Sequence, residues 1–168
     1  MFDEEIISAA TKLVNKAVGL GLWVTTAESC TGGLIAGALT SISGASNCVG
    51  AGYVTYSNEA KEQALTVSVE NLNKFGAVSQ EVALDMAAGA LNVSNADLAL
   101  AVTGIAGPGG GSLEKPVGLV YIAAVGGTNR QFSKVLRHEF GDIGRTAVRR
   151  ETVLQALALG LEALEQTN

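Results

Sequence analysis

The amino-acid sequence predicts a single α/β domain with the architecture of a three-layer α/β/α sandwich. Segments whose apolar residues recur at helical spacing alternate along the chain with short, β-rich apolar runs. Of the 168 residues, 48% are hydrophobic and only 16% are charged, which indicates that most elements are buried on at least one face. The length suits one domain, residues 1–168, with a substantial core. This pattern does not determine the order of the strands.

The elements expected in the first half of the chain follow from hydrophobic periodicity and capping residues. In order they are a helix over 3–20, a strand over 22–26, a helix over 34–42, a strand over 49–56, a short helix entered at 57–61 and a helix over 79–91. Asn58 is a plausible cap of the short helix and Ser79 of the last one, since both residue types favour that position. The residues expected on buried helix faces are Ile6, Ala10, Leu13, Ala17, Leu20, Val82, Ala83, Met86, Ala87 and Ala90.

The second half of the chain contains the predicted central strand. Residues 97–102 are expected to form this buried strand, which ends in a glycine-rich loop over 103–112. A strand over 117–125, a strand nearer an edge over 130–139 and a long helix from about Thr146 follow. The apolar stripe of that helix consists of Val148, Val153, Leu154, Leu157, Ala158, Leu161 and Leu164. In such a sandwich the loops at the strand ends form the ligand site.

Charge and cysteine content argue against several classes of function. The net charge is −5 and the eleven Lys and Arg residues are scattered, which argues against nucleic-acid binding but is compatible with a small anionic ligand. The acidic N-terminus lacks the basic region of a secretory signal and no apolar run approaches a membrane span, so we expect a cytoplasmic protein without membrane contact. Cys30 and Cys48 have no metal-ligand spacing and are expected to be reduced thiols.

The stretch from Ala27 to Gly33 is the centre of the candidate site. It lies between a β-rich run and a helical segment, so it is expected to form a tight turn at the start of a helix. Gly32 and Gly33 let the backbone approach a ligand closely, and the helix start offers N–H groups to an anion or oxyanion. Ser29 is either a nucleophile or a helix cap, and the local pattern alone favours the cap.

Other familiar sites do not fit this chain. The segment Gly104–Gly111 contains neither a dinucleotide-binding fingerprint nor a Walker loop, so neither NAD nor ATP is indicated. The single histidine, His138, falls in the expected edge strand, where a solvated surface residue is the simpler interpretation. A lysine in a low-dielectric pocket is the better candidate base for Ser29, although Lys61 taken alone is more simply a surface lysine. Glu28 is either a buried hydrogen-bonding residue or an acid catalyst.

Five ordered motifs, spread over nearly the whole chain, carry a specific family resemblance. They are Thr26–Gly33 (TAESCTGG), Val54–Lys61 (VTYSNEAK), Gly76–Ser79 (GAVS), Thr103–Pro108 (TGIAGP) and Lys115–Gly118 (KPVG). The set resembles the CinA C-terminal domain family, and the length is similar to that of its stand-alone members. The resemblance implies hydrolysis of the carboxamide of nicotinamide mononucleotide (NMN), giving nicotinate mononucleotide and ammonia in NAD salvage. It also implies a homodimer.

The resemblance implies roles for individual residues at the matching positions, with a catalytic Ser29, Tyr56 and Lys61. Ser29 would attack the carboxamide carbon, and Lys61, neutral in the resting site, would accept its proton directly or through Tyr56. The residues expected to contact the substrate or its oxyanion are Glu28, Thr31, Gly32, Gly33, Thr103, Gly104, Ile105, Ala106, Gly107 and Arg145. No metal or organic cofactor is implied.

Arg145 departs from the family pattern, in which glycine, aspartate and arginine are consecutive. Here Ile143-Gly144 separates Gly141-Asp142 from Arg145. Arg145 is therefore either a solvated turn residue or a contact to the substrate phosphate, acting together with N–H groups of the Gly104–Gly111 loop.

A function from a different class is also compatible with the sequence. The domain would then be a nucleotide-binding or competence-associated interaction module that retains the pocket without turnover, as the family's name and its fusion to other domains allow. The presence of Ser29, Tyr56 and Lys61 together favours catalysis.

Overall fold

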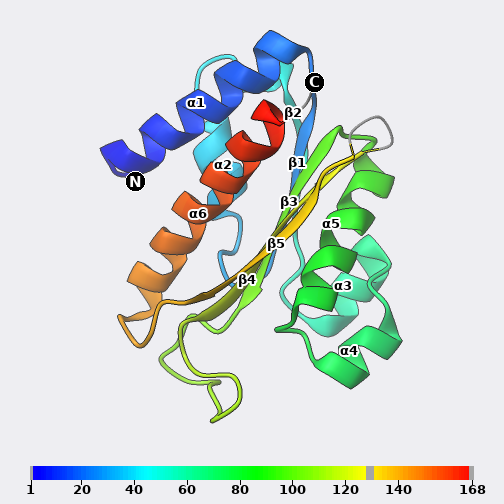
Figure 1. Ribbon diagram of the computed structural model, residues 1–168, viewed down its shortest axis with the longest axis vertical. Coiled ribbons are helices and arrows are strands. Elements are labelled where there is room, and N and C mark those ends of the chain that lie inside the picture. The colour runs from blue at the N-terminus through cyan, green and yellow to red at the C-terminus, as the bar shows by residue number, and fades with distance from the viewer. Residues whose placement is uncertain (1, 128–130, 167–168) are drawn as a thin grey trace.

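The computed structural model describes residues 2–127 and 131–166, in which a five-stranded sheet carries helices on both faces (Figure 1). The predicted α/β/α architecture is thereby confirmed. The elements are, in chain order, α1 (Glu4–Leu20), β1 (Val24–Glu28), α2 (Leu34–Thr40), the 3-10 helix η1 (Ala45–Asn47), β2 (Val49–Val54), α3 (Asn58–Leu65), α4 (Val69–Phe75), α5 (Gln80–Ser94), β3 (Leu98–Gly104), β4 (Leu119–Gly126), β5 (Ser133–Glu139) and α6 (Arg145–Glu165).

The sheet is mixed, and its order places the first three strands of the chain side by side. The order is β2-β1-β3-β4-β5, with β1 parallel to β2 and β3, and with β4 antiparallel to β3 and β5. Glu28, the last residue of β1, is in register with Val54 of β2 and Val102 of β3. The chain therefore leaves three adjacent parallel strands at the same edge of the sheet, where ligand sites of α/β proteins form.

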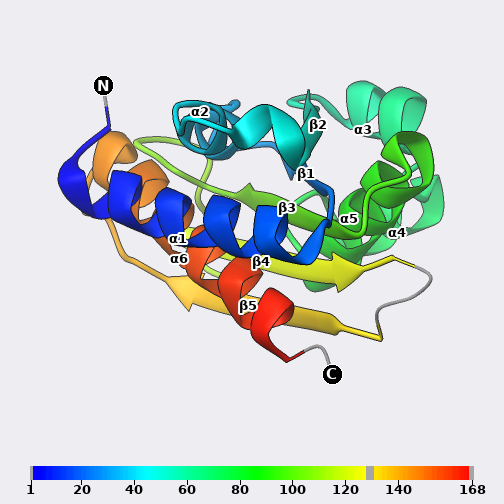
Figure 2. The same ribbon diagram turned by 90° about the horizontal axis from the view of Figure 1, so that it is seen from above.

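The two faces of the sheet differ in side-chain size. Figures 1 and 2 show α1, α2 and α6 on one face and α3, α4 and α5 on the other. Toward α1 and α6, β3 presents Leu98, Leu100 and Val102, whereas toward α5 it presents Ala99 and Ala101. The short alanine side chains let α5 approach the sheet closely.

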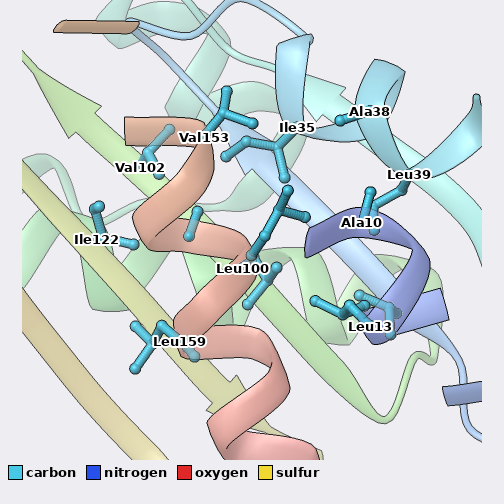
Figure 3. Packing of buried hydrophobic residues seen from close by; sticks show 14 of the residues in the cluster. Ala10, Leu13, Ile35, Ala38, Leu39, Leu100, Val102, Ile122, Val153 and Leu159 are labelled. Carbon is cyan, nitrogen blue, oxygen red and sulfur yellow. The ribbon is translucent and has the colours of Figure 1, made fainter. Parts of the chain in front are cut away.

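The larger hydrophobic cluster joins α1, α2 and α6 to the sheet (Figure 3). Leu100 of β3 and Ile122 of β4 pack in this cluster with Leu13 of α1, Ile35 of α2 and Val153 of α6. All five side chains are completely buried. This packing holds the N-terminal ends of α2 and α6 beside the sheet edge at which β1 and β3 end.

Gly89 makes the close approach of α5 to α3 possible. A Cβ atom at position 89 would lie 1.9 Å from the carbonyl oxygen of Leu65, the last residue of α3. Only glycine avoids this overlap with the backbone. The contact positions α3, which carries Lys61, against α5.

Side-chain caps begin several helices. Asp3 caps α1 and Ser79 caps α5, and the cap at Ser79 is as predicted. At α3 the cap is Ser57, whose Oγ accepts a hydrogen bond from the N–H of Ala60. The predicted cap at Asn58 is therefore wrong by one residue, and Asn58 is the first residue of the helix.

The boundary between β3 and the glycine-rich loop differs from the prediction. Thr103 and Gly104, which the sequence pattern assigns to the loop, continue β3 and lie opposite β4. Here β-pairing with a distant strand outweighs the local turn preference of glycine. β4 begins only at Leu119, because Gly118 has a φ of +89° and forms the turn that precedes the strand.

Further differences concern short elements and strand ends. The sequence pattern predicts no helix over Val69–Phe75, where α4 forms after a cap at Ser68. β2 ends at Val54, two residues earlier than predicted. Arg130, the predicted start of the edge strand, lies outside the described residues, and β5 begins at Ser133. The predicted edge position of this strand is confirmed.

The predicted buried helix faces are largely confirmed. Leu20 is an exception with 45% exposure, because α1 ends there and the chain turns at Gly21 in the left-handed conformation. Ala158 is exposed on α6, and Leu154 and Leu161 are only partly buried. The buried face of α6 is therefore shifted from the predicted stripe, and it also includes Ala156, Leu159 and Ala163.

Both cysteines are free, as predicted, and both are buried. His138 differs from its predicted solvated state, because its ring stacks on Phe140 with centroids 5.1 Å apart. Its Nε2 is buried without a hydrogen-bond partner in the described part of the chain, and burial lowers the pKa of His138.

Replacing Gly89 with alanine is expected to destabilise the fold by about 1–3 kcal/mol or more, because the new Cβ overlaps a backbone carbonyl. Gly19 of α1 provides a matched control, since a Cβ there meets nothing within 4 Å and alanine favours a helix by up to about 1 kcal/mol. Thermal unfolding of G89A and G19A beside the wild type measures the difference. An unchanged melting temperature for G89A contradicts the close packing of α3 on α5.

Candidate active site

Ser29 lies directly after β1, at the edge of the sheet where three parallel strands end. Its N–H donates to the carbonyl oxygen of Val102 at 3.0 Å, and its own carbonyl oxygen accepts from the N–H of Gly32 at 3.1 Å. Ser29 is 9% exposed. The N-cap of α2 is Gly33, with a φ of +92° and no side-chain cap. The interpretation of Ser29 as the helix cap is therefore wrong.

Glu28 satisfies the N-terminus of α2 in place of a capping side chain. Its fully buried carboxylate accepts hydrogen bonds from the N–H groups of Gly33 and Ile35 at 3.0 Å and of Ala36 at 2.8 Å. It also accepts from the hydroxyl of Thr31 at 2.6 Å. Four donors of the protein itself thus surround the carboxylate, which is how a buried charge is stabilised.

Lys61 extends from the first turn of α3 into the interior. It is 1% exposed, so the interpretation as a surface lysine is wrong. Its Nζ lies 3.1 Å from Ser29 Oγ, 2.8 Å from the carbonyl oxygen of Thr55 and 3.4 Å from that of Tyr56. No carboxylate pairs with it among the residues that the structure describes.

The surroundings of Lys61 favour its neutral form. Burial disfavours the charged amine and lowers the pKa of Lys61 below 10.5. Cys30 opposes this only as a thiolate, and burial raises the pKa of Cys30 to about 11. A neutral amine has two N–H bonds, which the carbonyl oxygens of Thr55 and Tyr56 accept, and one lone pair. That lone pair then faces the hydroxyl of Ser29, as proton transfer from a serine requires.

Arg145 joins the segment after β2 to the glycine-rich loop after β3. Its Nη2 donates to the hydroxyl of Tyr56 at 3.1 Å, and its Nη1 donates to the carbonyl oxygen of Gly107 at 3.2 Å. Arg145 is the first residue of α6, so it is a helical residue and not a solvated turn residue. Tyr56 is 60% exposed, and its hydroxyl contacts Arg145 rather than the amine of Lys61.

The remaining sequence motifs are tied together by hydrogen bonds between segments. Thr103 Oγ1 donates to the carbonyl oxygen of Ala77 at 2.7 Å and joins β3 to the segment before α5. Lys115 Nζ donates to the carbonyl oxygen of Phe75 and joins the glycine-rich loop to α4. The structure therefore connects segments from all five motifs around the edge where β1, β2 and β3 end.

The backbone donors at this edge fall into two groups. The N–H groups of Gly32, Gly33 and Ile105 are bonded within the protein. In the described part of the chain, no other residue provides an acceptor for the N–H groups of Cys30, Thr31, Ala106 and Gly107. Only the second group is available to a ligand without breaking an existing hydrogen bond.

Arg149 of α6 is a residue of the site that the sequence does not single out. Its Nη2 donates to the carbonyl oxygen of Thr31 at 2.8 Å. A Cβ atom on Gly32 would lie 3.5 Å from the same nitrogen. The sequence carries two signals for it: Val148-Arg149 matches a valine-arginine pair of the family pattern, and the spacing of four residues from Arg145 places both guanidinium groups on the same side of a helix.

Within residues 2–127 and 131–166 no group of three His, Cys, Asp or Glu side chains is placed to hold a metal ion. None of the helices described there combines the length and the hydropathy that a membrane span requires.

The geometry first defines a class of site. A serine hydroxyl contacts a buried amine that forms no ion pair with the described residues, and both lie at the ends of parallel strands. This arrangement is suited to acyl transfer. A model of the CinA C-terminal domain matches residues 7–164. The chain therefore belongs to the CinA C-terminal domain family, and the family predicted from the five motifs is confirmed.

Similar proteins carry two kinds of name. The nicotinamide-nucleotide amidohydrolase PncC of Escherichia coli K12 is 44% identical over 157 residues, covering 94% of this chain and 93% of that protein. The crystal structure of competence/damage inducible protein CihA from Agrobacterium tumefaciens has a TM-score of 0.91 and 54% identity, with 99% of both chains covered. A putative competence-damage inducible protein of Clostridium tetani is 56% identical over 101 residues, and the match spans 25% of its length.

Replacing Lys61 with methionine is expected to raise the melting temperature at pH 7. The pKa of Lys61 is lower in the folded than in the unfolded state, so this lysine destabilises the fold at every pH at which it is protonated in the unfolded chain. Each kcal/mol gained corresponds to about 2–4 °C for a domain of this size. Stability of the wild type rises with pH toward 10.5, so the advantage of K61M shrinks between pH 7 and 10. The control K12M alters an exposed lysine of α1 and should show no such pH dependence. A constant K61M difference over this range contradicts the lowered pKa.

Proposed function

We propose that this protein is a nicotinamide-nucleotide amidohydrolase, which converts NMN and water into nicotinate mononucleotide and ammonia in pyridine-nucleotide salvage. The observation that carries this proposal is the 3.1 Å contact between Ser29 Oγ and the buried amine of Lys61. It occurs in a chain that is similar, over most of its length, to proteins named for this reaction. The reaction needs no metal and no organic cofactor.

Ser29 acts as the nucleophile in the first half of the proposed reaction. Its Oγ attacks the carboxamide carbon of NMN while the lone pair of Lys61 accepts the hydroxyl proton. The carboxamide carbon becomes tetrahedral, and its oxygen becomes an oxyanion. Direct transfer is favoured over a relay through Tyr56, because the hydroxyl of Tyr56 contacts Arg145.

Collapse of the tetrahedral intermediate breaks the carbon–nitrogen bond. The proton held by Lys61 passes to the leaving nitrogen, so that ammonia departs and an ester links Ser29 to the nicotinate carbonyl. In the second half, water attacks this ester while Lys61 again accepts a proton, which it returns to Ser29 Oγ. The products are nicotinate mononucleotide and the free enzyme.

The oxyanion requires hydrogen-bond donors that no other group occupies. We assign this role to the N–H groups of Cys30 and Thr31, which follow the nucleophile in the chain and have no acceptor on any other described residue. Gly32 and Gly33 of the predicted set then contribute the backbone conformation of the turn, since their N–H groups are already bonded.

The phosphate of NMN is assigned to a second part of the site. Arg145 provides a guanidinium group, and the N–H groups of Ala106 and Gly107 are the available donors of the adjacent loop. In this assignment Thr103, Gly104 and Ile105 support that loop through the bonds that tie β3 to its neighbours. Tyr56 contacts Lys61 through its backbone carbonyl oxygen and Arg145 through its hydroxyl. In this assignment its exposed ring packs against the bound substrate. The homodimer stays a prediction of the family resemblance.

Replacing Ser29 with alanine is expected to abolish ammonia release from NMN and to leave the melting temperature nearly unchanged, because only the nucleophilic oxygen is removed. S8A, which alters an exposed serine of α1, is the control and should keep full activity. The measurement is ammonia release with NMN, paired with thermal unfolding. Full activity of S29A contradicts the nucleophile assignment, whereas an inactive wild type contradicts the proposed function and favours a binding or interaction module.

Replacing Arg145 with alanine is expected to lower kcat/KM for NMN by about ten- to a hundredfold, the cost of about 1.5–3 kcal/mol for losing a charge-assisted contact. The hydrolysis of nicotinamide riboside, which lacks the phosphate, should change little. R137A removes an exposed arginine of β5 and serves as the control. Equal losses on both substrates would show that Arg145 is structural, and no loss on either would exclude a role in binding.

A further inference from the structure

The turn that carries Ser29 lies between two opposite charges. On one side the buried carboxylate of Glu28 accepts the hydroxyl of Thr31 at 2.6 Å. On the other side the guanidinium of Arg149 donates to the carbonyl oxygen of Thr31 at 2.8 Å. Thr31 is completely buried, and it is the residue through which these two charged side chains are connected.

Glu28 and Arg149 do not form an ion pair with each other. Ion pairs among the described residues include neither Glu28 nor Arg149. The carboxylate instead binds the N–H groups at the start of α2, and the guanidinium extends from the second turn of α6. Thr31 therefore connects β1, α2 and α6 at a point two residues from Ser29.

We propose that Thr31 is a positioning residue: held by Glu28 on one side and by Arg149 on the other, it orients the N–H groups of Cys30 and Thr31 toward the oxyanion formed at Ser29. This inference rests on the proposed function for the identity of the oxyanion. The hydroxyl and the carbonyl oxygen of Thr31 are both engaged within the protein, and its backbone N–H is the one polar group of this residue without a partner among the described residues. In this proposal Glu28 and Arg149 act through their hydrogen bonds to the turn.

The inference changes the role expected for Glu28. Its carboxylate already occupies the start of α2, where it accepts hydrogen bonds from the N–H groups of the N-cap Gly33 and of two helix residues, Ile35 and Ala36. A substrate phosphate or carboxylate at the same place would meet a buried negative charge. The start of α2 therefore serves to hold the turn, and the anionic end of the substrate binds elsewhere.

A positioning role has a kinetic signature that simple support of the fold lacks. Displacing oxyanion donors by a fraction of an ångström weakens the transition state and leaves ground-state binding of the substrate intact. The loss should thus appear in kcat and not in KM. It should also appear with a reagent that phosphonylates activated serines, because its phosphoryl oxygen uses the same donors.

The test compares T31V with T31S. Valine keeps the volume of Thr31 but removes the hydroxyl that Glu28 accepts, whereas serine keeps the hydroxyl. T31V should lower kcat for NMN by about 10- to 100-fold with KM changed less than about twofold, and the rate of Ser29 labelling by a fluorophosphonate probe should fall in parallel. T31S should restore both rates to within about threefold of the wild type.

R149M tests the same link from the other side, including the case in which T31V does not fold. It should reproduce the loss in kcat and in labelling, and T31V/R149M should lose about as much as the more impaired single variant, because both changes release one turn. Wild-type kcat in folded T31V and R149M overturns the inference, as do equal losses in T31V and T31S. Labelling that depends on Thr31 in a protein inactive on NMN supports the inference while contradicting the proposed function, and absence of both activities in the wild type contradicts both.

Discussion

The removal of the Lys61 amine from water underlies the whole candidate site. A solvated lysine is an ammonium ion and has no lone pair, so it cannot accept a proton from Ser29. Burial to 1% exposure, with contacts to two backbone carbonyl oxygens and no ion pair to a carboxylate of the described residues, favours the neutral amine. The site requires α3 to pack closely on α5, and the missing side chain of Gly89 on α5 makes room for that position. The packing of α3 on α5 at Gly89 thus supports the proton transfer that we propose between Ser29 and Lys61.

The turn that carries Ser29 has a second buried ionisable group beside it, Glu28, whose surroundings are the opposite of those of Lys61. Lys61 has no counter-ion among the described residues, whereas Glu28 is surrounded by four hydrogen-bond donors. Only the carboxylate is therefore stabilised as an ion, since an ion in the interior needs partners and a neutral amine does not. The two buried groups on either side of Ser29 consequently differ in their tasks. In the proposed reaction Lys61 accepts a proton, whereas the carboxylate of Glu28 holds the turn that carries Ser29.

Much of the fold was predictable because helices and strands depend on spacing along the chain. The stripe of apolar residues in α5 and the cap at Ser79 are local features, and both match the structure. The predictions failed where a distant segment decides the outcome. Gly104 continues β3 because β4 pairs with it, and Ser29 does not cap α2 because the carboxylate of Glu28 already accepts the N–H groups there. Local preference in each case is weaker than a bond to another part of the chain.

The same distinction between local features and contacts with distant segments applies to the candidate site. Sequence motifs were sufficient to select Ser29, Tyr56 and Lys61 and to place the chain in its family, since motif order is a property of the chain alone. From local pattern Lys61 is a surface lysine and Arg145 a possible turn residue, because neither burial nor a partner in another segment is visible there. Arg149 received no role from the sequence, because its contact with Thr31 joins residues 118 positions apart. Burial, the neutral state of an amine and contacts between distant segments exist only once the strands are ordered and the helices packed, and for that reason the tertiary structure alone decided them.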